Sequence, residues 1–191
     1  MESLKQKILQ EGTAIGSAIV KVDGFINHRI DVKFMDEMGC EFKRRFADAK
    51  VDKILTIEAS GIAIAMAAAR YFDYAPVIFA KKAAPNTMVE DCLAAEAKSF
   101  TKGTVSLIRV TAKFLQKGDN ILILDDFLAH GEAASALCDI VEQAGANVVG
   151  IGDAIEKKFQ GGAARLREKG YRVESLAVIE NIQDGVITFE E

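Results

Sequence analysis

Tryptophan is absent from the 191-residue chain, and proline, histidine and cysteine are scarce, with two, two and three residues. The cysteines, Cys40, Cys92 and Cys138, form no C-x-x-C pair, and two histidines cannot complete a zinc site of the usual spacing. Widely spaced cysteines are typical of a reduced intracellular protein, and helical patterns predict that Cys40 and Cys138 are buried thiols. These scarcities argue against a disulfide scaffold and a zinc module.

Long apolar runs and an excess of positive charge are absent as well. The longest apolar run, residues 62–69, is far too short to span a bilayer, and residues 1–5 carry no signal-peptide pattern. A net charge of −4 provides no general basic surface for nucleic acid. Because half of the residues are apolar and the length suits one core, we expect a single cytoplasmic domain with no membrane or nucleic-acid partner.

Strand and helix patterns alternate along most of the chain. Asp31 is predicted to cap a helix with one apolar face, which runs from Phe34 to Phe46. Further elements, strands and helices in chain order, are predicted over residues 53–57, 62–71, 77–80, 106–110, 121–124, 132–144, 147–155, 163–169, 172–179 and 185–189. Outside this alternation lie a short helix, an extended arm or loose hairpin, and a segment of little periodicity, at residues 3–10, 13–27 and 83–105. The order predicts an α/β domain with a parallel sheet.

One stretch combines an apolar strand, two acids and a helix start. Residues 121–124 are apolar, Asp125 and Asp126 follow, and a short loop with Gly131 leads to a helix that begins at Glu132. Ligands of parallel sheets bind beyond the carboxyl ends of the strands, and unpaired amides at a helix start suit a phosphate. Carboxylates can accept hydrogen bonds from hydroxyls or hold a metal. The stretch therefore predicts a site for a ligand that carries both phosphate and hydroxyls.

Two other interpretations of the acid pair are open. The two acids can be a helix cap and a solvated side chain. They can also belong to a response-regulator receiver, but that fold requires an aspartate at the end of the first strand, where this chain has Thr56-Ile57-Glu58. Two further segments follow predicted strands: Glu58-Ala59-Ser60-Gly61, whose small residues let amides approach an anion, and the pair Lys81 and Lys82. Their ordinary interpretations are a helix cap and a solvated strand end.

Residues 121–133 resemble the binding motif for phosphoribosyl pyrophosphate (PRPP) in the type I phosphoribosyltransferases. The whole chain is similar to the bacterial members of that family that act on xanthine. Many members have hydroxyl side chains in the loop, whereas this chain has Ala129-His130-Gly131-Glu132-Ala133, so that backbone amides would carry the phosphate contact. The resemblance implies a type I phosphoribosyltransferase fold, a parallel sheet flanked by helices. It also implies a core of residues 31–156 under a small hood built from residues 1–30 and 157–191.

The resemblance also implies roles for individual residues. Asp125 and Asp126 would bind the ribose hydroxyls and stabilise an oxocarbenium-like transition state, and residues 129–133 would bind the 5′-phosphate. Pyrophosphate contacts are expected from Ser60, Gly61 and Lys81, and xanthine contacts from Val20, Asn27, Lys157 and Phe127. Asn27 can instead cap a turn, Lys157 can face solvent and Phe127 can belong to the core. Residues 97–104 are similar to the loop that closes over the site in this family, although a hairpin turn would have the same composition.

The expected reaction transfers the phosphoribosyl group of PRPP to N9 of xanthine in purine salvage. The resemblance implies Mg²⁺ bound with PRPP, no metal held directly by the protein, and a homodimer. Two alternatives are open. One is a transferase for guanine or hypoxanthine; adenine is disfavoured because Lys157 can donate to a 6-oxo group but not accept from a 6-amino group. The other is a PRPP-sensing regulator of the same fold that binds nucleic acid.

Overall fold

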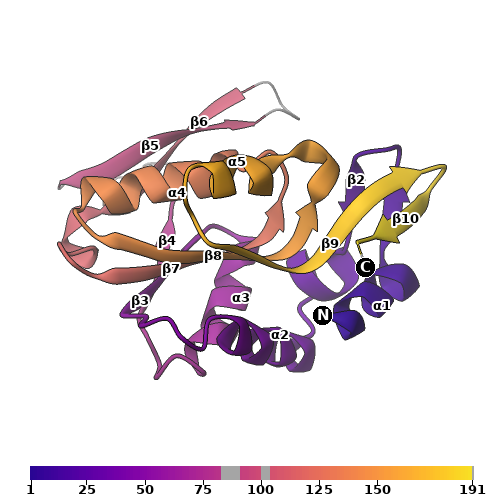
Figure 1. Cartoon of the computed structure of the whole chain (residues 1–191), viewed down its shortest axis with the longest axis horizontal. Helices are drawn as coiled ribbons and strands as arrows, with labels where there is room; N and C mark the ends of the chain where they lie inside the picture. The colour runs from indigo at the N-terminus through magenta and orange to yellow at the C-terminus, as the bar shows by residue number, and fades with distance from the viewer. Residues whose placement is uncertain (83–90, 100–103, 191) are drawn as a thin grey trace.

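The computed structural model of the chain describes residues 1–82, 91–99 and 104–190, and its centre is a six-stranded sheet in the order β10-β9-β8-β7-β3-β4 (Figure 1). The strands are β3 (Lys53–Ile57), β4 (Val77–Ala80), β7 (Asn120–Leu128), β8 (Asn147–Lys157), β9 (Val173–Gln183) and β10 (Val186–Phe189). Five of them are parallel, and β10 pairs antiparallel with β9. The predicted parallel sheet is confirmed.

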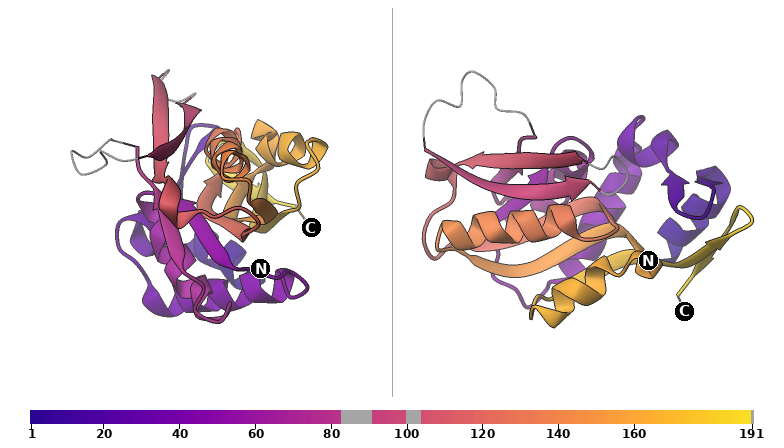
Figure 2. Two further views of the ribbon diagram at one scale, coloured as in Figure 1. Left: turned by 90° about the vertical axis from the view of Figure 1, so that its left-hand side faces the viewer. Right: turned by 90° about the horizontal axis from the view of Figure 1, so that it is seen from above.

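Helices cover both faces of this sheet (Figures 1 and 2). One face carries α2 (Val32–Arg45) and α3 (Ser60–Ala69), and the other carries α4 (Glu132–Gln143) and α5 (Gly162–Glu168). Two buried clusters of side chains result, one on each face, because a strand covered on both sides has apolar residues in both directions. The central strand β7 is buried between the two clusters, so its carboxyl end is positioned by the whole core.

The helix α2 forms where the sequence predicted it. The carboxylate of Asp31 accepts a hydrogen bond from the N–H of Phe34 (3.1 Å) and caps the helix. Gly39 lies so close to α3 that a Cβ there would be 2.8 Å from the carbonyl carbon of Ala67. Cys138 is buried in α4 as predicted, but the prediction for Cys40 is wrong. Cys40 is exposed, because it lies outside the helix face that packs on α3.

The N-terminal segment and β10 gather at one end of the sheet (Figures 1 and 2). They comprise α1 (Glu2–Glu11), an antiparallel hairpin of β1 (Thr13–Ile15) and β2 (Ile19–Lys21), and the π-helical turn η1 (Asp23–Asn27). The sequence predicted the arm as an extended segment or loose hairpin, and it is a short hairpin. The turn η1 was not predicted, since its residues Asp23-Gly24-Phe25-Ile26-Asn27 have no helical repeat.

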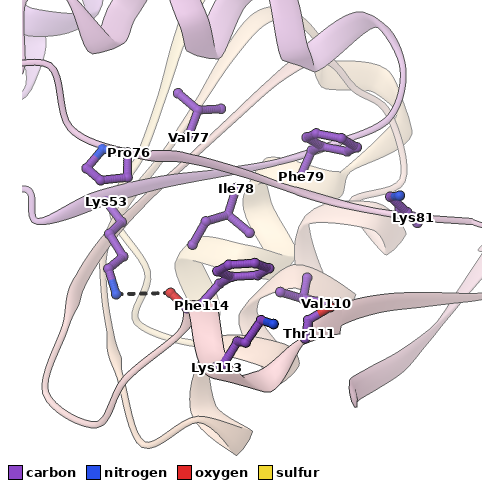
Figure 3. Close-up of a pocket in the computed structure, with 10 residues that line it drawn as sticks. All are labelled: Lys53, Pro76, Val77, Ile78, Phe79, Lys81, Val110, Thr111, Lys113 and Phe114. Carbon is purple, nitrogen blue, oxygen red and sulfur yellow. Dashed lines mark hydrogen bonds between the residues drawn. The ribbon is translucent and has the colours of Figure 1, made fainter. Parts of the chain in front are cut away.

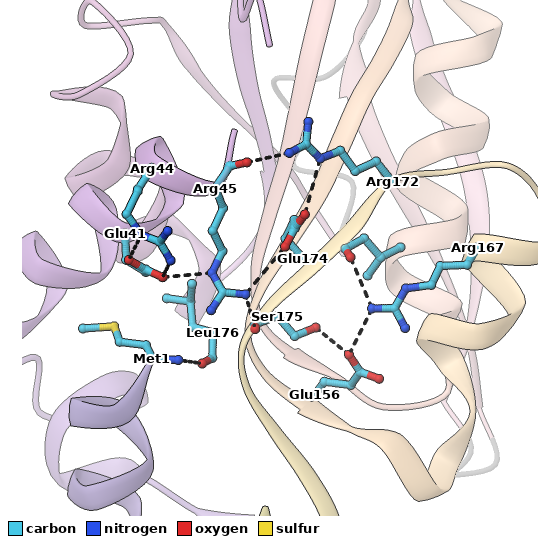
Figure 4. Close-up of polar contacts among 11 residues, drawn as sticks. Met1, Glu41, Arg44, Arg45, Glu156, Arg167, Arg172, Glu174, Ser175 and Leu176 are labelled. Carbon is cyan, nitrogen blue, oxygen red and sulfur yellow. Dashed lines mark hydrogen bonds and ion pairs between the residues drawn. The ribbon is translucent and has the colours of Figure 1, made fainter. Parts of the chain in front are cut away.

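Polar contacts attach this end of the molecule to β9 (Figure 4). The amino group of Met1 donates to the carbonyl of Leu176. Arg45, at the end of α2, donates to the carbonyl of Ser175 (2.9 Å). The carbonyl of Arg45 in turn accepts a hydrogen bond from the guanidinium of Arg172 (2.6 Å). Both the N-terminal helix and α2 are thus held against the same strand.

A second hairpin, β5 (Cys92–Ser99) and β6 (Thr104–Thr111), packs on α4. Only β6 was predicted. The alanine-rich residues 92–97 show little strand periodicity, and antiparallel pairing with β6 determines their conformation. Of the segment 97–104 that was predicted to close over the site, residues 97–99 and 104 belong to this hairpin, and residues 100–103 lie outside the described residues. No helix in the described part of the chain is long and apolar enough to cross a membrane.

Candidate active site

The two adjacent acids lie in the central strand rather than at its tip. β7 continues past Asp125 and Asp126 to Leu128, and the residue opposite Asp125 in β8 is Asp153. This corrects the predicted strand end at Leu124, and the cause is the pairing with β8, which continues to Leu128 and which the local pattern of β7 did not reveal. Neighbouring side chains of a strand point to opposite faces. Asp125 is accordingly buried, with 8% of its surface exposed, whereas Asp126 is only partly buried.

Asp125 is enclosed by the start of α3. A Cβ at Gly61 would lie 2.7 Å from Oδ1 of Asp125 and 2.1 Å from the hydroxyl of Thr56, so only glycine fits there. The same carboxylate oxygen accepts a hydrogen bond from the N–H of Asp126 (2.9 Å). Burial raises the pKa of Asp125 well above its usual range, and the neighbouring carboxylates of Asp126 and Asp153 raise it further. Asp125 therefore holds a proton more readily than a solvated carboxylate does.

Asp153 is a buried acid that the sequence reasoning missed. Its side chain is 1% exposed, and neither carboxylate oxygen has a hydrogen-bond partner among the described residues. Burial raises the pKa of Asp153 well above its usual range, and the negative charges of Glu156 and Asp126 raise it further. Glu156, three positions further along β8, accepts a hydrogen bond from the hydroxyl of Ser175 (2.6 Å; Figure 4). The sequence feature that could have identified Asp153 is its position as the one aspartate within the apolar residues 148–155.

Most of the predicted ligand contacts line one pocket of about 260 Å³. The predicted residues among its walls are Asp125, Phe127, Ala129, His130, Gly131, Glu132, Ala133 and Lys157. Five residues that were not predicted as contacts also line it, namely Ala18, Ile19, Leu128, Ala134 and Gln160. The pocket thus joins the loop after β7 to the end of β8 and to the hairpin of the N-terminal arm.

The loop after β7 leads into the start of α4, where unpaired backbone amides can bind an anion. Gly131 has φ 78° and ψ 10°, a left-handed conformation that favours glycine, and it precedes the first residue of α4, Glu132. The carbonyl of Gly131 accepts the N–H of Ser135 (2.8 Å), which closes the first turn. The N–H groups of that turn have no acceptor within the helix, and the helix dipole adds positive potential there. The carboxylate of Glu132 lies in the same turn and opposes that potential.

Lys157 and Phe127 line the same pocket and contact each other. The ammonium of Lys157 donates to the carbonyl of Ala18 (2.8 Å) and lies 5.2 Å from the ring centroid of Phe127. Burial lowers the pKa of Lys157, and the carboxylate of Asp126 acts in the opposite direction. The amide of Asn27 donates to the carboxylate of Asp126 (3.4 Å). Two base-contact candidates therefore flank the partly buried acid.

Val20 and Lys81 are placed differently from these residues. The side chain of Val20 is buried in the core cluster, and it is the adjacent Ile19 that lines the pocket. Lys81 lines a separate pocket of about 690 Å³ at the edge of the sheet, with its ammonium 5.7 Å from the ring centroid of Phe79 (Figure 3). The roles predicted for Val20 and Lys81 stay predictions.

The segment between β3 and α3 borders the acid pair. Its Glu58–Ala59 peptide bond is cis, and Ser60 and Gly61 form the first turn of α3. The carboxylate of Glu58 accepts the N–H of Lys82 (2.6 Å), which joins the segment to the end of β4. The close approach of Gly61 to Asp125 places the start of α3 beside this acid, and the pyrophosphate role of Ser60 and Gly61 stays a prediction.

The strand, loop and helix that carry the acid pair lie within a known domain. Residues 38–185 match the phosphoribosyl transferase domain, and the chain belongs to this family of transferases. Curated relatives include the xanthine phosphoribosyltransferase of Clostridioides difficile (strain 630), which is 53% identical over 99% of this chain and 100% of the relative. The xanthine phosphoribosyltransferase of Laribacter hongkongensis (strain HLHK9) is 49% identical over the same shares of both chains.

Solved structures with low sequence identity share the fold. The adenine phosphoribosyltransferase of Giardia lamblia, complexed with 9-deazaadenine, has a TM-score of 0.77 and 19% identity, and the match covers 92% of this chain and 96% of that one. The enzyme of Rhodothermus marinus DSM 4252, also an adenine phosphoribosyltransferase, has a TM-score of 0.74 and 22% identity, and the match covers 94% and 100%. The expected type I phosphoribosyltransferase fold is confirmed.

Proposed function

We propose that this protein transfers the 5-phosphoribosyl group of PRPP to N9 of xanthine, giving xanthosine monophosphate and pyrophosphate in purine salvage. The observation that carries the proposal is the single pocket in which the loop 129–133, Asp125 and Lys157 meet. The names of relatives that are about half identical over their full length support xanthine as the base.

In this reaction the chain supplies position and charge rather than a covalent intermediate. The amides of residues 129–133 hold the 5′-phosphate at the start of α4. The carboxyl groups of Asp125 and Asp126 bind the ribose hydroxyls, and the negative charge of Asp126 stabilises the positive charge that develops at C1′. N9 of the base attacks C1′ as pyrophosphate leaves, so the configuration at that carbon inverts. Holding both substrates in this geometry supplies most of the acceleration.

Pyrophosphate leaves toward the start of α3. The amides of Ser60 and Gly61 lie next to Asp125, and they bind the departing oxygens in this scheme, together with the ammonium of Lys81. Lys81 follows β4, and its ring contact with Phe79 involves only the side chain, whose rotamers can redirect the ammonium. Its distance from the acid pair makes this the contact that most depends on side-chain movement.

The base enters between the arm and the end of β8. Lys157 donates to the 6-oxo group, and it exchanges its present acceptor, the carbonyl of Ala18, for the base. Phe127 stacks on the purine face, and Asn27 has both a donor and an acceptor for the base edge. Val20 supports this wall from the buried side of the arm. Residues 1–30 and 157–191 act as a hood over a core of residues 31–156 in this scheme.

Mg²⁺ accompanies PRPP in the proposed reaction. Among the described residues, no group of three or more histidine, cysteine, aspartate or glutamate side chains is arranged to hold a metal. The cation would be held mostly by the oxygens of PRPP itself, with no direct ligand from the protein. Bound with PRPP, the cation neutralises the charge of the pyrophosphate group.

The proposed homodimer has a suitable surface at the edge strand β4. Exposed Phe79 and Phe114 line the pocket there, beside the ammonium groups of Lys53, Lys81 and Lys113 (Figure 3). An edge strand with apolar side chains is a site where another chain can pair or pack. Sedimentation equilibrium of the purified protein tests this part: a mass of one chain at micromolar concentration would contradict it.

A panel of bases tests the activity. The purified protein is incubated with PRPP, Mg²⁺ and, separately, xanthine, guanine, hypoxanthine, adenine or orotate, and the nucleotides are separated by chromatography. We expect the highest initial rate with xanthine. A preference for guanine or hypoxanthine would contradict the assignment of xanthine as the base but not the transfer of the phosphoribosyl group from PRPP. PRPP binding without a nucleotide product from any base would contradict the enzyme and favour a PRPP-sensing protein.

A further inference from the structure

The phosphate loop, residues 129–133, contains no hydroxyl side chain, so its affinity for phosphate depends on where its backbone amides point. We propose that Gly162 and Arg165 of α5 are positioning residues that hold this loop from behind and direct its amides into the pocket. The inference rests on the proposed function, since it assigns the 5′-phosphate to this loop.

Two consecutive carbonyls of the phosphate loop are bound by the start of α5. The N–H of Gly162 donates to the carbonyl of Ala129 (3.1 Å), and the guanidinium of Arg165 donates to the carbonyl of His130 (2.6 Å). In a trans peptide the C=O and the following N–H point in opposite directions. Binding the carbonyls of Ala129 and His130 on one side therefore directs the amides of His130 and Gly131 to the other side.

Gly162 also sets the distance between α5 and the loop. A Cβ at this position would lie 2.4 Å from the carbonyl oxygen of Ala129 and 2.7 Å from the nitrogen of Gly131, both of which are backbone atoms. Gly162 does not have the positive φ that favours glycine, so the backbone conformation itself accepts alanine. Alanine would consequently act by displacing the loop, since backbone cannot rotate away as a side chain can.

Arg165 connects the phosphate loop to the base side of the pocket. The same guanidinium nitrogen that contacts His130 also donates to the carbonyl of Gln160 (3.2 Å). Gln160 ends the short turn η3 (Lys158–Gln160), which directly follows Lys157, and it lines the same pocket. One side chain on the outside of the molecule thus holds both walls of the pocket at a fixed separation.

Binding of two probes to the full-length protein separates this role from a general structural one. Ribose 5-phosphate carries the 5′-phosphate without pyrophosphate, and pyrophosphate occupies only the other phosphate site. By titration calorimetry, Arg165→Ala should weaken ribose 5-phosphate binding by about threefold to tenfold, the worth of one hydrogen bond, and leave pyrophosphate binding unchanged. Arg165→Lys should lie between, because an ammonium can reach one carbonyl. Gly162→Ala should weaken ribose 5-phosphate binding at least as much as Arg165→Ala.

Arg167 provides the matched control. It lies on the same helix, donates to the carbonyl of Val173 (3.2 Å) and lies 3.7 Å from the buried carboxylate of Glu156, and among the described residues neither of these partners belongs to the loop. Arg167→Ala should bind both probes as the unchanged protein does. The positioning role would be overturned if Arg165→Ala weakened the binding of ribose 5-phosphate and of pyrophosphate equally. It would also be overturned if Arg167→Ala weakened ribose 5-phosphate binding as much as Arg165→Ala does, or if ribose 5-phosphate did not bind the unchanged protein. Arg165-dependent ribose 5-phosphate binding without turnover of any base would instead keep the positioning role and contradict the proposed function.

Discussion

The phosphate side and the base side of the pocket are built in different ways. The phosphate side is continuous in sequence, from Asp125 through the loop to Glu132, and it rests on β7 and α4 at the centre of the core. The base side joins Lys157 to Ala18, which are 139 residues apart, through one hydrogen bond of 2.8 Å. The phosphate side is one continuous motif that the core and α5 support, whereas the base side also requires the N-terminal arm to stay attached.

This difference separates the chemistry from the choice of base. Apart from Lys81, the proposed contacts to ribose, phosphate and pyrophosphate belong to β7, the loop after it, α4 and the start of α3, which the core holds in place. The proposed base contacts come from the arm, from η1 and from the end of β8, together with Phe127 of β7. Changes at the arm can therefore alter the preferred base while the transfer reaction is kept. Mutations on the two sides should produce distinct kinetic effects.

The largest effect is expected from Asp126→Asn. This change removes a negative charge that stabilises the positive charge developing at C1′, so turnover should fall by about 100-fold or more. The protein should still fold, since Asp126 is only partly buried. Asp125→Asn should cost less, because burial raises the pKa of Asp125 and asparagine resembles its protonated form. Turnover at saturating substrates and the melting temperature measure both effects; unchanged turnover in Asp126→Asn would remove that residue from the mechanism.

Lys157→Met tests the base side alone. Loss of a charged donor should raise the KM for xanthine by about tenfold to 100-fold, with a smaller change in the KM for PRPP. The neighbouring Lys158→Met is the matched control, because the ammonium of Lys158 instead pairs with Glu180 (2.7 Å) and Glu190 (2.8 Å) at the surface. Initial rates with each substrate varied in turn measure the two KM values. If both KM values rise equally in Lys157→Met, the residue does not contact the base.

Gly61→Ala should lower both stability and turnover, because the added methyl group has no room beside Asp125. The added Cβ would meet the hydroxyl of Thr56 and the carboxylate of Asp125, so we expect a loss of about 1–3 kcal/mol in the free energy of unfolding. Turnover should fall by about tenfold, since the acid pair shifts. Urea unfolding and steady-state rates measure these effects. Gly24→Ala is the control, because its Cβ would have only a carboxylate oxygen of Glu11 nearby, at 3.9 Å; equal losses in both variants would contradict the close contact at Gly61.

The smallest effect on activity is expected from Asp153→Asn, which should change how stability depends on pH. The folded-state pKa of Asp153 is raised above that of the unfolded chain. Its contribution to stability is thus fully present below the unfolded pKa of about 3.9 and is lost as the pH rises through the folded pKa. Asparagine avoids this loss, so the variant should be more stable than the unchanged protein at pH 8, by about 1.4 kcal/mol for each unit of the shift.

Urea unfolding at pH 4 and pH 8 provides the measurement for Asp153. The stability difference between the two proteins should be small at pH 4, because Asp153 is then largely protonated in the folded state and partly so in the unfolded chain. A difference of the same size at both pH values would mean that Asp153 is stabilised by contacts and not by its protonation.

Local sequence predicted those parts of the protein whose conformation depends on near neighbours. The cap at Asp31 and the strand–loop–helix from residue 121 onward were predicted, and a hairpin was one of the two forms predicted for the arm. The strand β5 was not foreseen, because its pairing partner and not its own composition makes it extended. The extension of β7 past the acid pair and the position of Asp153 opposite Asp125 depend on the pairing of β7 with β8, which the local pattern of neither strand specifies.

The sequence by itself determined the class of the site, because the acids, the glycine and the start of a helix are adjacent in the chain and their chemistry follows from that order. Tertiary structure decided which of the two acids is buried, and that Gly61 encloses Asp125. It also brought Gly162 and Arg165 behind the phosphate loop. These contacts join residues far apart in the chain, and such proximity follows from the packing of strands and helices in the folded core rather than from any local pattern.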